Sequence, residues 1–258
     1  MDTVTDSVVS PDGTRIVYHV QGRGVPLVIV HGSIATTDMY RGIADLLAPH
    51  YRVVLMERRE YGPSGTGPRP CDFTRQAADL AAVLDAMGEP AFVFGHSFGG
   101  LVALHAMSDS PAVPRLALYE PSVALAGPVL ARVQTKAREL VAAGRQQDAL
   151  VEFFTARADP PPPADQLRWV AEQFAFRVPG MMADLECITS MDTDLTRWST
   201  LDTPILLLTG ENTDPLSKQS IARIQQILPN ARTTTLPGQA HHPENPRLVA
   251  DALREFFG

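Results

Sequence analysis

Residues 91–107, AFVFGHSFGGLVALHAM, place a serine in a tight turn between two apolar patterns of different period. AFVF is a short continuous apolar run, typical of a strand buried on both faces, and the residues after the turn continue as a helix. Ser97 stands between Gly95 and Gly99 in the pattern G-x-S-x-G, which requires this strand-to-helix context. Such a turn strains the backbone of the serine and leaves no room for flanking side chains. The stretch therefore predicts a nucleophilic Ser97, and a serine in an ordinary glycine turn is the alternative.

The rest of the chain repeats this alternation of strand and helix. Near-continuous apolar runs lie at 25–30, 51–56, 115–119 and 204–209, and helical periods lie at 37–48, 72–87, 98–109, 216–228 and 246–257. Before them, TDSVVSPDGTRIVYHV alternates on both sides of a Pro/Gly turn, as an antiparallel hairpin does. The predicted fold class is α/β: a mostly parallel doubly wound sheet with an N-terminal antiparallel hairpin, whose chemistry gathers at the carboxyl ends of the strands.

The alternation stops between about residues 123 and 200. Four helical stretches follow one another there, broken by Gly144 and by Pro160 to Pro163. A segment of this length with its own secondary structure is an insertion rather than a loop. It leaves and rejoins the sheet at strand ends, so we expect a helical cap over the active edge. The predicted division is a core of residues 1–122 and 201–258 with a cap insertion of residues 123–200.

Composition and charge narrow the possible partners. The net charge of −7 and the lack of a Lys/Arg run disfavour a nucleic-acid partner, because phosphate contacts need clustered cations. No apolar stretch reaches membrane-spanning length, and the N-terminal residues lack the features of a signal peptide, so we expect a cytoplasmic protein without a membrane partner. Cys71 and Cys187 lie outside any Cys/His cluster, which predicts free thiols and no metal site.

Five short motifs follow the ends of predicted strands or lie near the C-terminus. They are VHGS, ERREYGPSG, GHSFGG, GENTDP and PGQAHHPENP. Together they resemble the α/β-hydrolases, specifically the capped bacterial branch with haloperoxidase-like and esterase-like members, and the resemblance covers essentially the whole chain. It implies an oxyanion hole formed by the backbone N–H groups of Ser33 and Phe98. It also implies that His31 braces its loop.

The family order of serine, acid and histidine places the general base near the C-terminus. The segment LPGQAHHPENP contains G-x-x-H, similar to the family's G-x-G-H loop, and this spacing selects His241. His242 is the second candidate. The histidines at positions 19, 50, 96 and 105 precede the required place, so we expect structural roles for them.

The acid of the triad has two candidates. Family members usually carry it as G-x-x-D after the seventh strand, and here Asp214 stands one residue late. Glu120, in LALYEP, lies at the carboxyl end of the sixth strand, where some relatives are thought to place their acid. Either carboxylate suits the chemistry, because the acid holds the imidazole tautomer and stabilises the imidazolium without taking the proton. We favour Glu120 over Asp214, because its longer side chain projects straight from a strand end.

Two further groups of residues have expected structural roles. In ERREYGPSG, Glu57 replaces the family's acid and Glu60 stands where glycine is usual, and we expect Glu57 and Arg59 to pair or to hold loops together. Large cap side chains are candidates to line an acyl pocket, but such a pattern is more typical of a cap core, so none is assigned to substrate. They are Trp169, Phe174, Phe176, Met181, Met182 and Trp198.

The combined expectation is a cofactor-free serine hydrolase that cleaves an ester, thioester or related acyl bond of a small apolar metabolite. A specialised enzyme of the same fold that performs epoxide opening, C–C cleavage, perhydrolysis or cyclisation is the first alternative. A non-catalytic binding protein is the second, because fold alone does not determine function. The intact serine and histidine argue against that last alternative.

Overall fold

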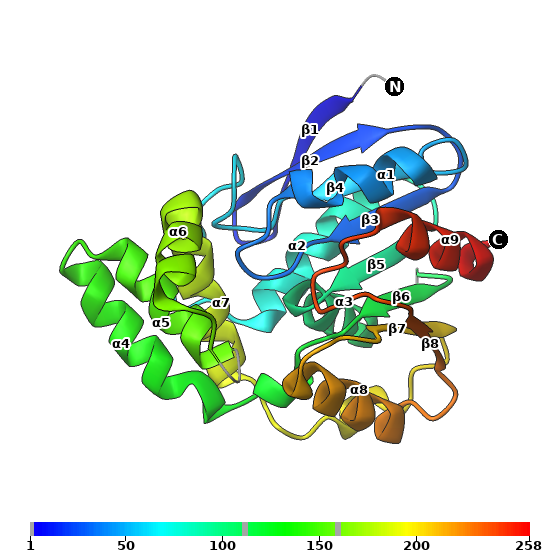
Figure 1. Ribbon diagram of the computed structural model, residues 1–258. Helices are drawn as coiled ribbons and strands as arrows, with labels where there is room; N and C mark the ends of the chain where they lie inside the picture. Colours follow the sequence, from blue (N-terminus) through cyan, green and yellow to red (C-terminus); the bar gives the residue numbers. More distant parts are fainter. Residues whose placement is uncertain (1–2, 110–112, 158–160) are drawn as a thin grey trace.

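A computed structural model describes residues 3–109, 113–157 and 161–258, and its backbone is built around one twisted sheet (Figure 1). Within these residues the sheet has eight strands in the order β1-β2-β4-β3-β5-β6-β7-β8. The strands are β1 Val4–Val9, β2 Arg15–Gln21, β3 Pro26–Val30, β4 Arg52–Met56, β5 Phe92–His96, β6 Leu116–Tyr119, β7 Ile205–Gly210 and β8 Arg232–Leu236.

The pairing of the strands confirms the predicted fold class. β1 and β2 form the antiparallel hairpin, β2 joins β4 antiparallel, and all pairs from β4 to β8 are parallel. The apolar runs predicted as strands all lie in the sheet, with ends that differ by one or two residues. β8 was not predicted, because RTTTL carries one strongly apolar side chain and is mostly exposed, as befits the edge of the sheet.

Helices cover both faces of the sheet, as the alternation predicts (Figure 1). Those outside the segment between β6 and β7 are α1 Arg41–Leu47, α2 Phe73–Ala86, α3 Phe98–Asp109, α8 Pro215–Ile227 and α9 Pro246–Phe257. Alternate residues of β3 point to opposite faces: Leu27 and Ile29 pack with α1 and α9, and Val28 and Val30 pack with α2 and α3. All four side chains are buried, so the carboxyl end of β3 is held rigidly.

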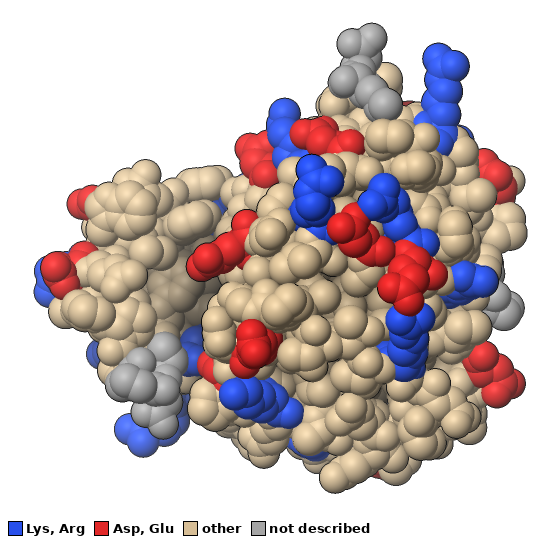
Figure 2. Space-filling view, turned by 45° about the vertical axis from the view of Figure 1, so that its right-hand side comes forward, with Lys and Arg blue, Asp and Glu red and all other residues tan. Residues whose placement is uncertain are grey.

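The segment between β6 and β7 forms a helical lobe beside the carboxyl ends of the strands (Figure 1). Its helices, called the cap helices below, are α4 Ala131–Ala142, α5 Gln146–Arg157, α6 Ala164–Phe174 and α7 Val178–Ser190. They match the four predicted helical stretches, and Pro160 of the predicted break lies outside the described residues. Figure 2 shows this lobe standing apart from the body of the molecule with a hollow between them. Within the described ranges, none of the helices is both long and apolar enough to cross a membrane.

The packing of α9 generates a stability prediction. Leu253 is fully buried in the core under α9, and Arg247 is exposed on the same helix. Leu253→Ala should lower the free energy of unfolding by about 2–5 kcal/mol, because it removes buried methyl groups and leaves a cavity. Arg247→Ala should change it by no more than about 0.5 kcal/mol. Urea unfolding followed by circular dichroism checks both, and an equal loss in the two variants would contradict the assigned packing.

Candidate active site

Ser97 occupies a strained turn between β5 and α3. Its φ of 55° lies in the left-handed region that L-residues rarely adopt. A Cβ on Gly95 would lie 2.7 Å from the carbonyl oxygen of Gly99, and a Cβ on Gly99 would overlap the carbonyl oxygen of Val30. Both flanking positions therefore exclude any side chain, as the steric argument from the sequence predicts. The turn directs the serine hydroxyl away from the sheet and into a cavity.

Three side chains from distant parts of the sequence meet at this turn. His241 Nε2 lies 3.0 Å from Ser97 Oγ, and His241 Nδ1 lies 2.8 Å from Glu120 Oε2. A carboxylate only accepts, so Nδ1 carries the proton in this contact and Nε2 is left to accept from the serine. The ring is thus oriented with Nε2 toward the serine and Nδ1 toward the carboxylate, which is the orientation that a general base needs.

Glu120 follows β6 and is held in one orientation. Its backbone has a φ of 45°, and its side chain is fully buried. Besides His241 it accepts hydrogen bonds from the Gly210 N–H at 2.7 Å and the Thr213 hydroxyl at 2.6 Å. Burial alone raises the pKa of Glu120, but the hydrogen bonds from His241 and the other donors outweigh it, so the pKa lies below its ordinary value. The group is a carboxylate at neutral pH.

Asp214, the other candidate acid, does not contact the imidazole directly. It caps the N-terminus of α8, accepting from the Ser217 N–H at 3.0 Å and the Ser217 hydroxyl at 2.7 Å. The Ser217 hydroxyl oxygen in turn lies 2.9 Å from His241 Nδ1. The structure thus brings Glu120 against the ring and connects Asp214 to it through one hydroxyl.

Glu120, Asp214 and His241 also present ligand atoms within 4.8 Å of one another, as a cation site would. Each of these atoms already has a hydrogen-bond partner, because Glu120 and Ser217 share Nδ1 and both oxygens of Asp214 face Ser217. The contacts are therefore accounted for without an ion, and a metal-free site stays a prediction.

One other histidine, His96, supports His241. The His96 Nε2 lies 2.8 Å from the His241 carbonyl oxygen, so Nε2 donates, and His96 Nδ1 accepts a short hydrogen bond from the Tyr40 hydroxyl. Burial lowers the pKa of His96 well below its ordinary value, so the ring is neutral. His242, the second candidate base, is exposed, and its ring centroid lies 6.2 Å from that of His96. His96 thus has the structural role expected of it.

The predicted oxyanion donors flank the serine. Ser33 and Phe98 line the same cavity as Ser97, and neither backbone N–H donates to a protein acceptor within the described part of the chain. Phe98 is the first residue of α3. The N–H groups of the first helical turn have no acceptor within the helix, so the Phe98 N–H has none there. Free N–H groups beside a nucleophile are what a developing oxyanion requires.

The loop that carries Ser33 is held by residues that sequence reasoning missed. Arg58 donates from Nε to the His31 carbonyl at 3.0 Å and from Nη2 to the Gly32 carbonyl at 3.2 Å, and the Tyr61 hydroxyl accepts from the Ile34 N–H at 3.0 Å. Ile34 has a φ of 62°, so this hydrogen bond supports a backbone of intrinsically high energy. His31 contributes by accepting from the Arg58 N–H at 3.2 Å, which agrees with its expected bracing role.

A buried ion pair connects this loop to the cap helices. Asp184 of α7 accepts from Arg58 Nη1 at 2.7 Å and Nη2 at 2.9 Å, and from the Tyr61 hydroxyl at 2.6 Å. Burial opposes the Arg58 charge, but Asp184 raises the pKa of Arg58 by more, so the guanidinium stays charged. No local pattern points to this pair, because its partners are 126 residues apart. We call Arg58, Tyr61 and Asp184 the loop clamp.

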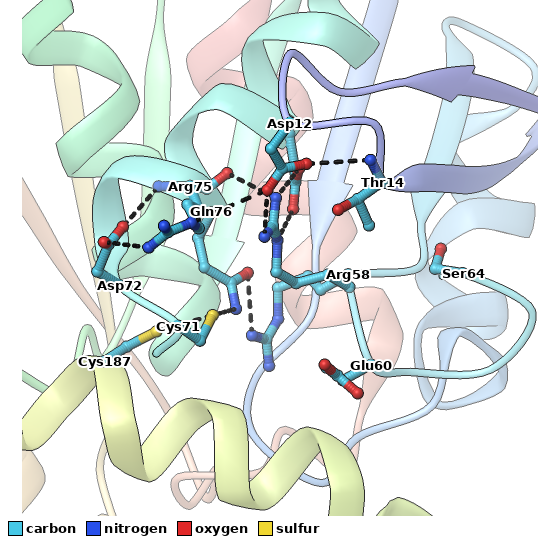
Figure 3. A network of polar contacts seen from close by, with 12 residues as sticks. Asp12, Thr14, Arg58, Glu60, Ser64, Cys71, Asp72, Arg75, Gln76 and Cys187 are labelled. Atoms are coloured by element: carbon cyan, nitrogen blue, oxygen red, sulfur yellow. Dashed lines mark hydrogen bonds and ion pairs between the residues drawn. The ribbon is translucent and has the colours of Figure 1, made fainter. Parts of the chain in front are cut away.

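The neighbourhood of Arg58 also contains the two cysteines (Figure 3). The Arg58 side chain reaches toward Gln76, whose amide lies 3.8 Å from Cys71 Sγ. Cys187 of α7 approaches Cys71 with 3.3 Å between the sulfurs, and both are free thiols, as predicted.

Glu57 and Arg59 do not pair with each other, which corrects one of the two expectations for them. Arg59 is bound by Asp79 at 2.6 Å and Asp12 at 2.8 Å, and it ties α2 to the N-terminal hairpin. Glu57 accepts from the Thr37 hydroxyl at 2.7 Å. Each therefore holds loops together with other partners. Glu60 has a φ of 66°, the conformation for which the family usually uses glycine.

A cavity of about 500 Å³ lies above Ser97, beneath the cap helices. Its walls come from Ser33, Ser97, Phe98, Ser122, Leu125, Leu130, Phe153, Phe154, Arg157, Pro162, Gln166, Leu167, Val170, Asp184, Leu185, Ile188, Asp214 and His241. The aromatic and Met candidates named from the sequence are absent from this wall. Trp198 is fully buried in the core, and Trp169 and Phe176 are exposed. Helical spacing predicted these helices but did not say which of their faces meets the cavity.

Comparison with known proteins agrees with this architecture. A family model described as "Alpha/beta hydrolase family" matches residues 27–252. A putative carbamate hydrolase, RutD, from Azorhizobium caulinodans is 27% identical, and the alignment covers 93% of this chain and 94% of that protein. The crystal structure of an alpha/beta hydrolase from Sphaerobacter thermophilus is 32% identical with a TM-score of 0.86, covering 98% of this chain and 100% of that one. The esterase RhEst1 from Rhodococcus is 25% identical with a TM-score of 0.74, covering 98% of each chain.

The family match spans most of the chain, the solved relatives share its whole fold, and the named relatives are hydrolases and esterases. The chain belongs to the alpha/beta hydrolase family.

Proposed function

We propose that the protein is a serine hydrolase that cleaves an ester, thioester or related acyl bond of a small metabolite. The observation that carries the proposal is the continuous series of contacts from Ser97 Oγ to His241 Nε2 at 3.0 Å and from His241 Nδ1 to Glu120 Oε2 at 2.8 Å. The hydrolase and esterase names of the relatives support the reaction class. The mostly apolar cavity above Ser97 supports a small substrate with apolar parts.

In the proposed mechanism His241 takes the proton of Ser97 as Oγ attacks the substrate carbonyl carbon. The carbonyl oxygen gains a negative charge, which the backbone N–H groups of Ser33 and Phe98 stabilise. His241, now an imidazolium paired with Glu120, gives the proton to the leaving group. Water then enters, gives a proton to His241 and attacks the acyl-enzyme, which releases the acid and restores Ser97.

Replacing the nucleophile tests the proposal most directly. Ser97→Ala should lower kcat for p-nitrophenyl acetate by about 10⁴-fold or more, because no acyl-enzyme forms. A fluorophosphonate should add to the wild-type protein and not to Ser97→Ala, as measured by intact mass. Ser122→Ala is the matched control, since the two hydroxyl oxygens lie 3.0 Å apart. It should keep the label and lose less than about tenfold in kcat. Unchanged turnover in Ser97→Ala would refute the mechanism.

Paired substitutions distinguish the two candidate acids. Glu120→Gln should lower kcat by about 10³- to 10⁴-fold, because the imidazolium loses its contacting carboxylate. Asp214→Asn should cost less than about tenfold, because Asp214 acts through Ser217 and asparagine is an equally good helix cap. Steady-state kinetics on well-folded variants, checked by thermal unfolding, decide the matter. A larger loss in Asp214→Asn would assign the acid to that residue instead.

The loop clamp should affect the oxyanion hole. Tyr61→Phe removes the acceptor of the Ile34 N–H and should lower kcat about ten- to a hundredfold with little change in KM, because Ser33 is then less well placed. Asp79→Asn is the control: it weakens the buried pair with Arg59 and should lower the melting temperature while kcat stays within about threefold. If Tyr61→Phe changed only the melting temperature, its role would be structural.

A further inference from the structure

One cation in the wall of the cavity has no hydrogen-bond or ion-pair partner among the residues that the structure describes. Arg157, at the C-terminal end of α5, lines the cavity together with Ser97 and His241. It is partly buried, and within the described residues it forms no hydrogen bond and no ion pair. From the same two helices, α5 and α6, the apolar side chains of Phe153, Phe154, Leu167 and Val170 line the cavity, together with the polar side chain of Gln166.

The two carboxylates in the same wall are already engaged. Asp184 receives both nitrogens of the Arg58 fork and the Tyr61 hydroxyl. Asp214 receives the backbone and the hydroxyl of Ser217 as the cap of α8. Among the residues that the structure describes, Arg157 is therefore the charged group of this wall whose N–H donors are free to bind a ligand.

The surroundings make this charge costly without an anion. Burial lowers the pKa of Arg157, and the charges of Asp214 and Glu120 only partly offset that effect. A guanidinium presents a planar fork of donors that matches a carboxylate bidentately, and such a pair in a site with little water is strong. A carboxylate that entered the cavity would meet a guanidinium that has no other partner among the described residues.

We propose that Arg157 binds a carboxylate on the substrate, so that the enzyme prefers acyl compounds with a free acid group, such as half-esters of dicarboxylic acids. The inference rests on the proposed function and refines it. The substrate expected from the sequence was apolar, and here an apolar chain in contact with the cap walls would join the carboxylate to the scissile carbonyl. The bond between Ser97 Oγ and the carbonyl carbon forms, the bond to the leaving alcohol breaks, and the alcohol takes its proton from His241. Water completes the turnover to a dicarboxylate and an alcohol.

The test compares monoethyl esters of the linear dicarboxylic acids from glutaric to sebacic acid with ethyl esters of monocarboxylic acids of the same length. The wild-type protein should favour the half-ester of the best length by about tenfold or more in kcat/KM. Arg157→Met should lower kcat/KM for that half-ester by about ten- to a hundredfold, mainly through KM, and leave the neutral ester within about threefold. Arg157→Lys should recover part of the loss, since it keeps the charge without the fork.

Arg168→Met on the exposed face of α6 is the matched control for the loss of one positive charge, and it should change neither ester. Equal losses on both esters in Arg157→Met, or no wild-type preference for half-esters, would overturn the proposal.

A binding measurement separates this inference from the proposed reaction. Calorimetric titration with adipate should show binding to wild-type protein that weakens about tenfold or more in Arg157→Met, whether or not any ester is hydrolysed. If no ester were hydrolysed and Ser97 were not labelled, the hydrolase mechanism would be refuted, but the carboxylate site would not. Equal adipate affinity in the two proteins would refute the carboxylate site alone.

Discussion

The left-handed backbone of Ser97 is the constraint on which the rest of the site depends. A residue at φ 55° persists only where its surroundings hold it. Here Gly95 lets the turn close on Gly99 and Gly100, and Gly99 lets it approach the Val30 and His31 carbonyl groups at the end of β3. The same contact places the serine turn next to the loop that follows β3 and carries Ser33. The hydroxyl, the Phe98 N–H and the Ser33 loop therefore share one rigid frame, as catalysis by preorganised donors requires.

Prediction from the sequence succeeded where local pattern and local structure coincide. The central strands are continuous apolar runs because both of their faces are buried, and the serine turn is local in sequence, so both could be recognised. β8 was not predicted, because an edge strand with exposed threonines contains no continuous apolar run. The residues that line the cavity were not predicted either. Phe153 and Leu167 differ from Trp169 in the face of the helix that they occupy, and the sequence does not show which face meets the cavity. The Arg58–Asp184 pair could not be predicted from the sequence, because its two residues are far apart in the chain and meet only in the folded protein.

This ion pair gives the cap helices a direct connection to the loop beside Ser97. Replacing a buried ion pair with apolar groups is often neutral for stability, whereas removing one partner is expensive, so such a pair specifies an arrangement more than it stabilises one. Arg58 also donates hydrogen bonds to the His31 and Gly32 carbonyls. The guanidinium that meets Asp184 of α7 is therefore the same group that holds the backbone next to Ser33. The cap helices and the loop that carries Ser33 thus share Arg58 as a common contact.

The two candidate acids are connected to the same nitrogen of His241, Glu120 directly and Asp214 through the Ser217 hydroxyl. His241 Nδ1 has one proton, and Glu120 lies 2.8 Å from it while the Ser217 hydroxyl lies 2.9 Å away. Because Ser217 donates its own proton to Asp214, it can only accept from Nδ1. The Ser217 hydroxyl lies between Asp214 and the ring, so the charge of Asp214 is farther from the ring than that of Glu120. Coulomb energy falls with distance, so Glu120 stabilises the proposed imidazolium more. Asp214 lies beyond Ser217, where its charge also raises the pKa of Arg157 and so favours the cation that we expect to meet the substrate carboxylate.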